Sequence, residues 1–200
     1  MILRSSPSSP FGRKCKISAS ILGLMDRFEI TRTDTNDPED PISRENPLAK
    51  IPALILDDGS VMYDSRVICE YFDNLAGGGK IIPKGDARWS ALTLQALGDG
   101  ILDAGILQVY EKRFRPEDKR HPAWVDRQAG KVSRALAHLE ANTPKAAETP
   151  AIGDITLACA LGYQDFRFEG TWRNTHPNLV AWLDSFAKAV PSYEETIPSD

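Results

Sequence analysis

Two short segments of the chain combine residue types that can hold a small molecule carrying charges of both signs. The first is Lys50-Ile51-Pro52, where a cation and an X–Pro bond stand at the start of an apolar run. The second is Asp64-Ser65, which opens an amphipathic stretch and offers a carboxylate and a hydroxyl. The N–H groups at the start of a helix there would favour an anion. Together the two segments are suited to hold a small zwitterion by its backbone and its charged ends.

A loop rich in serine and proline, residues 5–10, supplies a further hydroxyl at the start of the first expected helix. Ser9 precedes Pro10, and proline suits the first turn of a helix because no N–H is needed there. The Ser9 hydroxyl and the first-turn N–H groups can donate hydrogen bonds to an anion. Ser8 is the alternative, because the register of the loop is ambiguous, and such clusters also form simple turns.

The elements that would position these residues fall into two parts. Strand and helix signals alternate up to residue 76, glycines mark a linker at 77–86, and only helix signals follow in 87–200. A strand–helix–strand opening implies a parallel pair, and a hairpin signal at 57–60 adds antiparallel strands. The expected fold is an α/β domain with a mixed four-stranded sheet, followed by an all-α helical bundle. Strands are expected at 1–3, 28–33, 52–56 and 61–63, a weak helix or turn at 37–45, helices at 10–23, 64–75, 89–113, 122–141, 155–168 and 177–189, and a loosely packed polar tail at 191–200.

Two groups of residues inside the expected helices leave alternatives open. Gly98, Gly100 and Gly105 would each cost about 1 kcal/mol relative to alanine in a helix interior. They either allow another helix or a ligand to approach closely or mark a bend. Arg13 and Lys14 in the first helix either face the site or are exposed cations, which are common on helices.

Composition excludes several classes of protein. The net charge is −4 and no dense Lys/Arg run occurs, so nucleic acid is a poor candidate partner. No apolar run of 18 or more residues is present, so no membrane span is expected. The three cysteines are far apart and form no CxxC motif, which favours a reduced, cytoplasmic protein with Cys69 and Cys159 in the core. The three histidines are scattered, and no metal site is expected.

Four segments resemble the cytosolic glutathione transferases, and the first resembles their serine-bearing bacterial members. The resemblance covers essentially the whole chain. The combination of Lys50-Ile51-Pro52 with Asp64-Ser65 is a specific indication of this family, whereas either motif alone would be a weak one. The resemblance implies a thioredoxin-like domain that binds glutathione and a helical domain that contributes the electrophile site. The segments are 5–14, 46–54, 63–71 and 152–161.

The resemblance assigns the thiol end of glutathione to the first loop. Ser9 would stabilise the glutathione thiolate, and Phe11 would contact the ligand. Pro7, Phe11 and residues 96–114 would line a cleft for an apolar electrophile. Cys15 lies too far into the helix to touch the thiol.

The remaining parts of glutathione are assigned by the same resemblance. A cis bond between Ile51 and Pro52 would let Ile51 pair with the cysteinyl backbone. Asp64 and Ser65 would hold the γ-glutamyl head, although an N-cap role is compatible with this. Lys50 would lie near the glycyl carboxylate or the cysteinyl carbonyl, with a solvated lysine as the alternative.

The expected activity is conjugation of glutathione, a cosubstrate needing no metal, to an electrophilic small molecule in detoxification. The alternatives are a glutathione-dependent isomerase, peroxidase or dehalogenase, or a non-catalytic binding module on the same fold. The resemblance also implies a cytoplasmic homodimer, with the 64–75 and 89–113 helices near the two-fold axis.

Asp154 matches an aspartate that the family places at the start of its buried helix, where a Ser or Thr three residues earlier completes a capping box. Ala151 occupies that earlier position, so half of the box is absent, at a cost of about 1 kcal/mol. Asp154 is therefore expected to serve folding and not catalysis.

Overall fold

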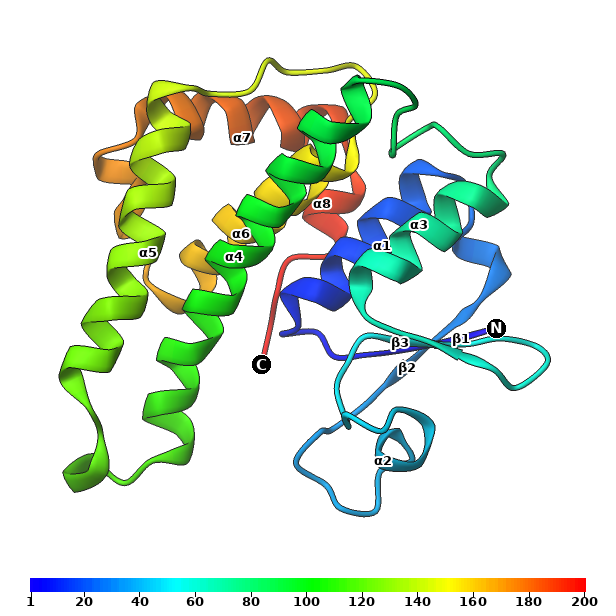
Figure 1. The fold of residues 1–200 in the computed structure, drawn as a ribbon, viewed down its shortest axis with the longest axis horizontal. Helices are drawn as coiled ribbons and strands as arrows, with labels where there is room; N and C mark the ends of the chain where they lie inside the picture. The colour runs from blue at the N-terminus through cyan, green and yellow to red at the C-terminus, as the bar shows by residue number, and fades with distance from the viewer.

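A twisted sheet carrying two helices on one face forms the N-terminal part of the computed structural model, which describes residues 1–200 (Figure 1). β1 pairs in parallel with β2 and antiparallel with β3, which pairs antiparallel with β4. The strand order is β2-β1-β3-β4, so the mixed four-stranded sheet predicted from the sequence is confirmed. The elements are β1 (Ile2–Ser5), α1 (Pro10–Ile21), β2 (Glu29–Arg32), α2 (Ile42–Glu45), β3 (Ala53–Ile55), β4 (Val61–Met62) and α3 (Ser65–Leu75), with a 3₁₀ turn at Met25–Arg27.

Helices alone make up the rest of the chain, as predicted. α4 and α5 form a long hairpin, and α6 packs between α4 and α1, so that it joins the two parts (Figure 1). A continuous apolar core accordingly includes Leu3 and Leu54 of the sheet together with Ile155 and Leu157 of α6. The elements are α4 (Ala87–Phe114), α5 (Pro122–Ala141), α6 (Ile152–Arg167), α7 (Pro177–Ala189) and α8 (Ser192–Glu195), with 3₁₀ turns at Glu117–Lys119 and Thr171–Asn174.

Two of the three α4 glycines lie where α6 approaches most closely. A Cβ on Gly98 would come within 2.9 Å of Thr156 Cγ2, and one on Gly105 within 3.2 Å of Gln164 Nε2. Gly100 faces open space. Close helix approach therefore accounts for Gly98 and Gly105, and only Gly100 lacks a packing role.

The expectation of a loosely packed tail is wrong for its first half, and the exposed alternative for Arg13 is also wrong. Tyr193 of α8 is 7% exposed and Arg13 is 1% exposed. Arg13 Nη2 donates to the Tyr193 carbonyl at 2.6 Å, and its guanidinium lies 4.0 Å from the centre of the Tyr193 ring. α1 lies between the sheet and the helical domain, so Arg13 and Lys14 have no access to solvent and bind elements that come later in the chain.

Asp73, in the last turn of α3, holds the linker to α4. Its buried carboxylate accepts hydrogen bonds from the backbone N–H groups of Gly79, Lys80 and Ile81, at 2.7, 2.9 and 2.8 Å. The Ile81 carbonyl in turn accepts from the Ile152 N–H at 2.7 Å. One carboxylate thus joins α3, the linker and the start of α6.

We expect Asp73→Ala to lower the free energy of unfolding by about 2–4 kcal/mol, because three buried N–H groups would lose a charged acceptor. Asp73→Asn keeps one acceptor oxygen and should lose less. Equilibrium urea unfolding measures both changes. A loss below about 1 kcal/mol for the alanine variant would contradict this role.

Candidate functional site

Strand register brings the three candidate segments to one end of the sheet. Arg4 near the end of β1 pairs with Ala53 at the start of β3, and Leu54 pairs with Met62 at the end of β4. The loop leading to Ser9 follows β1, and Asp64 follows β4. Three segments therefore meet at this end of the sheet, which we call the edge: the loop before α1, the Ile51–Pro52 segment and the start of α3.

Ser9 is the N-cap of α1, and Ser8 lies in the turn before it. The Ser9 Oγ accepts from the Gly12 N–H at 3.1 Å, so its own proton stays available for donation. The Phe11 N–H has no acceptor within the chain. A Cβ on Gly12 would come within 2.1 Å of Ser5 Oγ, so glycine there lets α1 pack directly on the end of β1. Two donors without an acceptor in the chain therefore lie at the start of α1.

Asn46 organises the loop that presents Ile51. Its side chain is buried, donates to the Lys50 carbonyl at 2.8 Å and accepts from the Leu48 N–H at 3.0 Å. The Ile51–Pro52 bond is cis, which confirms the expectation. The Ile51 N–H and C=O form no hydrogen bonds within the chain, so both are available to an extended ligand. The Lys50 side chain is exposed at the mouth of the loop.

Asp64 is the N-cap of α3 and keeps an outward-facing carboxylate. Its Oδ1 accepts from the Arg66 N–H at 2.9 Å, and its Oδ2 lies 3.1 Å from Arg66 Nη2. The Asp64 side chain is 55% exposed, whereas Ser65 is buried in the first turn. The Tyr63–Asp64 peptide is also cis. A carboxylate and a helix N-terminus therefore lie side by side, as the recognition of an ammonium and a carboxylate requires.

A buried ion pair behind Asp64 links the two parts of the molecule. Lys14 Nζ of α1 lies 2.6 Å from Asp99 Oδ1 of α4, with side chains that are 0% and 5% exposed. Asp99 Oδ2 lies 3.7 Å from Arg66 Nε. On the next turn of α4, burial and the Asp99 carboxylate raise the pKa of Asp103. A line of alternating charges thus runs from α1 through α4 and Arg66 to Asp64.

Sequence reasoning did not identify Asn46, Arg66 or Asp99 as site residues. A buried asparagine before a cis-proline loop is a local signal that could have been found, because its side chain serves residues within four positions. The Lys14–Asp99 pair spans 85 positions, and no periodicity in either helix indicates that these two charges meet.

Cysteines contribute no reactive group to the edge. Cys15, Cys69 and Cys159 are free and buried. Burial and the neighbouring Cys69 thiol raise the pKa of Cys15 well above its ordinary value, and burial raises the pKa of Cys159 to about 11. No group of three or more His, Cys, Asp or Glu side chains is close enough to hold a metal ion. None of the helices combines the length and apolarity needed to cross a membrane.

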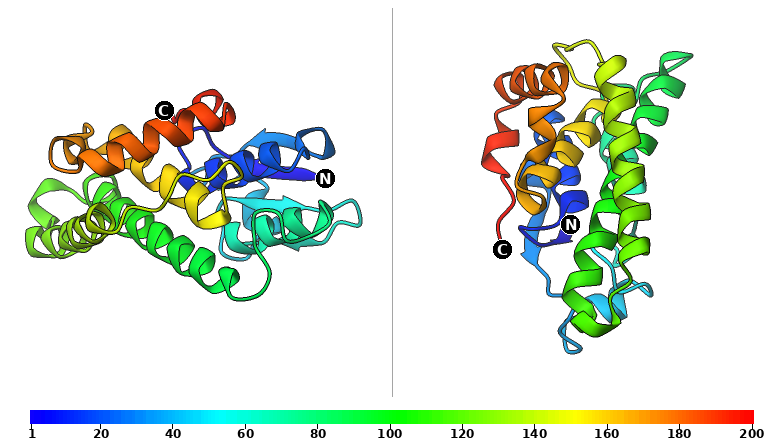
Figure 2. Two further views of the ribbon diagram at one scale, coloured as in Figure 1. Left: turned by 90° about the horizontal axis from the view of Figure 1, so that it is seen from above. Right: turned by 90° about the vertical axis from the view of Figure 1, so that its left-hand side faces the viewer.

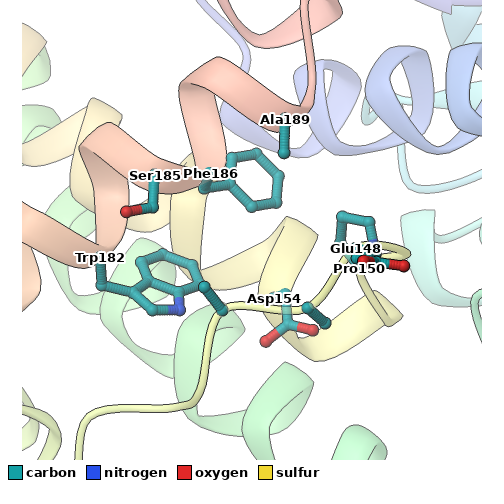
Figure 3. Close-up of a pocket in the computed structure, with 9 residues that line it drawn as sticks. Glu148, Pro150, Asp154, Trp182, Ser185, Phe186 and Ala189 are labelled. Carbon is teal, nitrogen blue, oxygen red and sulfur yellow. The ribbon is translucent and has the colours of Figure 1, made fainter.

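A separate hollow of about 240 Å³ lies on the helical domain, between the loop before α6 and α7 (Figure 3). Trp182, Phe186 and Pro150 line it, and Asp154 stands at its floor. Asp154 Oδ2 accepts from the Ala151 N–H at 2.9 Å, which is one half of a capping box. Burial raises the pKa of Asp154. None of the predicted glutathione-binding residues lines this hollow. The hydrogen bond from the Ala151 N–H agrees with the predicted capping position of Asp154.

We expect Ala151→Ser to raise the free energy of unfolding by about 1 kcal/mol, because a hydroxyl at this extended N-cap can accept from the Asp154 N–H and complete the box. Thermal or urea unfolding of the variant tests this. Ala141→Ser, at the last residue of α5, is the matched control and should bring no gain. An equal gain in both variants would show that the cap is not the cause.

Comparisons with known proteins agree with the geometry. Residues 3–80 match the model for the glutathione S-transferase N-terminal domain, and residues 122–185 match the C-terminal domain. The uncharacterized GST-like protein YibF of Escherichia coli (strain K12) is 31% identical over 203 residues, covering 96% of this chain and 98% of YibF. A glutathione transferase family member from Pseudomonas fluorescens Pf-5, solved with bound glutathione, is 42% identical with a TM-score of 0.92, covering 100% of this chain and 99% of that one. A structure of a family member from the same organism with bound S-(propanoic acid)-glutathione is 40% identical, with a TM-score of 0.88 and complete coverage of both chains.

Proposed function

The chain belongs to the glutathione S-transferase family, and from that premise we propose that it binds reduced glutathione and conjugates it to electrophilic small molecules. The observation that carries the proposal is the convergence of Ser9, Ile51 and Asp64 at one edge of the sheet. Ser9 and Ile51 have groups without an internal partner, and the Asp64 carboxylate is exposed. Glutathione bound to the Pseudomonas relative supports the choice of ligand.

Each part of glutathione has a matching group along this edge. The Ile51 N–H and C=O would pair with the cysteinyl backbone, and Asp64 would face the γ-glutamyl ammonium. Ser65 and the start of α3 would bind the γ-glutamyl carboxylate. Lys50 would face the glycyl carboxylate or the cysteinyl carbonyl, and Phe11 would contact the ligand near the sulfur.

Ser9 would act on the sulfur itself. A free thiol of pKa about 8.5 is only about 3% ionised at pH 7, and lowering that pKa by about two units makes it mostly thiolate. The shift needs about 2.7 kcal/mol, which one charge-assisted hydrogen bond from Ser9 and the N-terminus of α1 can supply. The thiolate then forms a C–S bond to an electrophilic carbon, while the leaving group departs with its electron pair. The bound S-(propanoic acid)-glutathione of the Pseudomonas family member supports room for a substituent on the sulfur.

The division of labour within the chain follows from the same proposal. Residues 1–76 would form the glutathione-binding domain, and residues 77–86 would link it to the helical domain. Residues 87–200, the helical domain, would contribute the electrophile site. We further propose a cytoplasmic homodimer with a detoxifying role. The exposed Trp89 on α4 and Val67 on α3, 68% and 48% exposed, favour contact between subunits along these two helices.

Calorimetric titration with reduced glutathione tests the proposal. Wild-type protein should bind in the millimolar range or tighter, and Asp64→Ala should bind at least tenfold more weakly, because the ammonium loses its counter-charge. Asp26→Ala, at an exposed turn remote from the edge, serves as the control and should bind like the wild type. An absence of binding to the wild type at millimolar glutathione would instead favour a non-catalytic module.

A further inference from the structure

An arginine at the end of α6 combines a fixed position with unused hydrogen-bonding capacity. The Arg167 side chain is only 14% exposed, and its guanidinium lies 3.9 Å from the centre of the Phe166 ring. Its Nε is buried and has no hydrogen-bond partner. A buried donor without an acceptor is costly, and a ligand oxygen that reached Nε after the covering tail moved away would bring a net gain.

A second arginine, Arg113, and the buried Tyr163 influence the same part of the molecule as Arg167. Arg113, in the last turn of α4, lies close enough to lower the pKa of Asp200, and both Arg113 and Arg167 act to lower the pKa of Tyr163. Burial is the larger effect on Tyr163, and the net result is a raised pKa, so the phenol stays protonated as a further donor. Gly98 of α4 packs on Thr156 of α6 and Gly105 packs on Gln164, so the two helices run side by side in the same direction. Arg113 and Arg167 both follow this contact and therefore lie toward the same end of the helix pair.

A carboxylate from the tail pairs with Arg167. Asp200 Oδ1 lies 2.8 Å from Arg167 Nη2, and the Asp200 side chain is 75% exposed. Arg167 is the fixed half of the pair and Asp200 the solvated half. Because exposed ion pairs contribute little stability, another carboxylate can replace Asp200 without leaving Arg167 unpaired.

The C-terminal tail, which ends in Asp200, passes the N-terminal turns of α1, the helix whose N-cap is Ser9. Thr196 Oγ1 accepts from Arg13 Nε at 3.3 Å, and Arg13 lies one turn into α1. The four residues from there to Asp200 span at most about 14 Å. All views place the C-terminal end beside the start of α1, on the side of the helical domain (Figures 1 and 2).

Aromatic side chains on α4 provide an apolar surface next to Arg113. Tyr110 and Phe114 are 43% and 56% exposed, and their rings meet edge to face with centres 5.0 Å apart. Exposed aromatic rings at the end of α4 that carries Arg113, with Arg167 at the end of the adjacent α6, suit a planar molecule that ends in a carboxylate.

We propose that Arg167 and Arg113 recognise a carboxylate on the second substrate, and that the Asp200 carboxylate occupies this position until the substrate displaces it. The inference rests on the proposed glutathione transfer and narrows its electrophile to aromatic carboxylic acids that bear a leaving group. With 4-chloro-3-nitrobenzoate, the thiolate sulfur bonds to the ring carbon bearing chlorine. Chloride leaves with the electron pair of the broken C–Cl bond, and the carboxylate is unchanged.

A pair of matched substrates tests the assignment. We compare kcat/KM for 4-chloro-3-nitrobenzoate with that for the uncharged 4-chloro-3-nitrobenzamide, each divided by the rate constant of its uncatalysed reaction with glutathione. The wild type should favour the benzoate. Arg167→Gln should lower the benzoate-to-benzamide ratio about tenfold, and Arg167→Lys, which keeps the charge, should lower it less.

Asp200→Asn should raise the same ratio, because it removes the competing carboxylate at an exposed position where folding is not at risk. Arg88→Gln, on the first turns of α4 in an ion pair with Glu70, is the control and should leave the ratio unchanged. A wild-type ratio near one, or a ratio unaffected by both Arg167→Gln and Asp200→Asn, would overturn the inference while leaving glutathione transfer intact. A wild type that binds no glutathione in the calorimeter would overturn the proposed function and the inference with it.

Discussion

Replacing Ser9 with alanine is expected to lower kcat/KM for glutathione conjugation by on the order of 10- to 100-fold. In the proposed complex the Ser9 hydroxyl would donate to the glutathione sulfur, because its lone pair already accepts from the Gly12 N–H and its proton remains available. A hydrogen bond to a charged group is worth about 1.5–3 kcal/mol, and each 1.4 kcal/mol corresponds to a factor of ten. Steady-state kinetics with an uncharged electrophile at saturating glutathione measures the loss.

Control variants separate this role from the helix cap. Ser9→Ala also removes the N-cap of α1, at about 1 kcal/mol of stability. Ser9→Asp retains the cap but places a negative charge at the sulfur, so it should be stable and inactive. Ser9→Thr retains the hydroxyl and should keep most activity. Full activity of Ser9→Ala together with loss of activity in Ser8→Ala would transfer the role to Ser8.

Replacing Asp99 with asparagine is expected to lower the free energy of unfolding by about 3–5 kcal/mol. The variant leaves the Lys14 ammonium buried without a counter-charge, and Lys14 has a fully buried side chain. Glutathione affinity should fall as well, because Asp99 also faces Arg66, which contacts Asp64. Urea unfolding followed by tryptophan fluorescence, together with calorimetry, measures both effects.

A double variant shows whether the unpaired charge is the cause. Lys14→Met combined with Asp99→Leu removes both charges and should recover most of the lost stability, because a buried pair is often replaceable by apolar residues. Glu70→Gln breaks the more exposed pair with Arg88 and should cost less than about 1 kcal/mol. Equal instability of the double variant and Asp99→Asn would show that packing, and not charge, governs this position.

The parts of the site that depend on local sequence could be predicted. The Asp64 cap depends on neighbouring residues, so a short motif indicates it. The same holds for α5 and α7, whose bounds agree with the prolines at their starts and the end of their apolar pattern. The cis bond before Pro52 is expected only from the family resemblance, because cis is the minority state of X–Pro bonds.

The parts that depend on contacts between distant elements could not be predicted. A cation on a helix is normally solvated, and no sequence pattern near Lys14 indicates that Asp99 is its partner. The same applies to Arg13, which is buried by α8 and the tail. The position of Asp200 on Arg167 likewise follows from how the tail folds back on α1, so this ion pair could not be predicted from the sequence.

Ionisation of the glutathione thiol in the binary complex tests the central claim most directly. We would titrate the ultraviolet absorbance of the thiolate against pH, with the protein in excess over glutathione and the Ser9→Ala protein in parallel. We predict an apparent thiol pKa about two units below the free value of about 8.5 in the wild type, and a value much closer to that of free glutathione in Ser9→Ala. A bound thiol that titrates like free glutathione in the wild type would contradict the account.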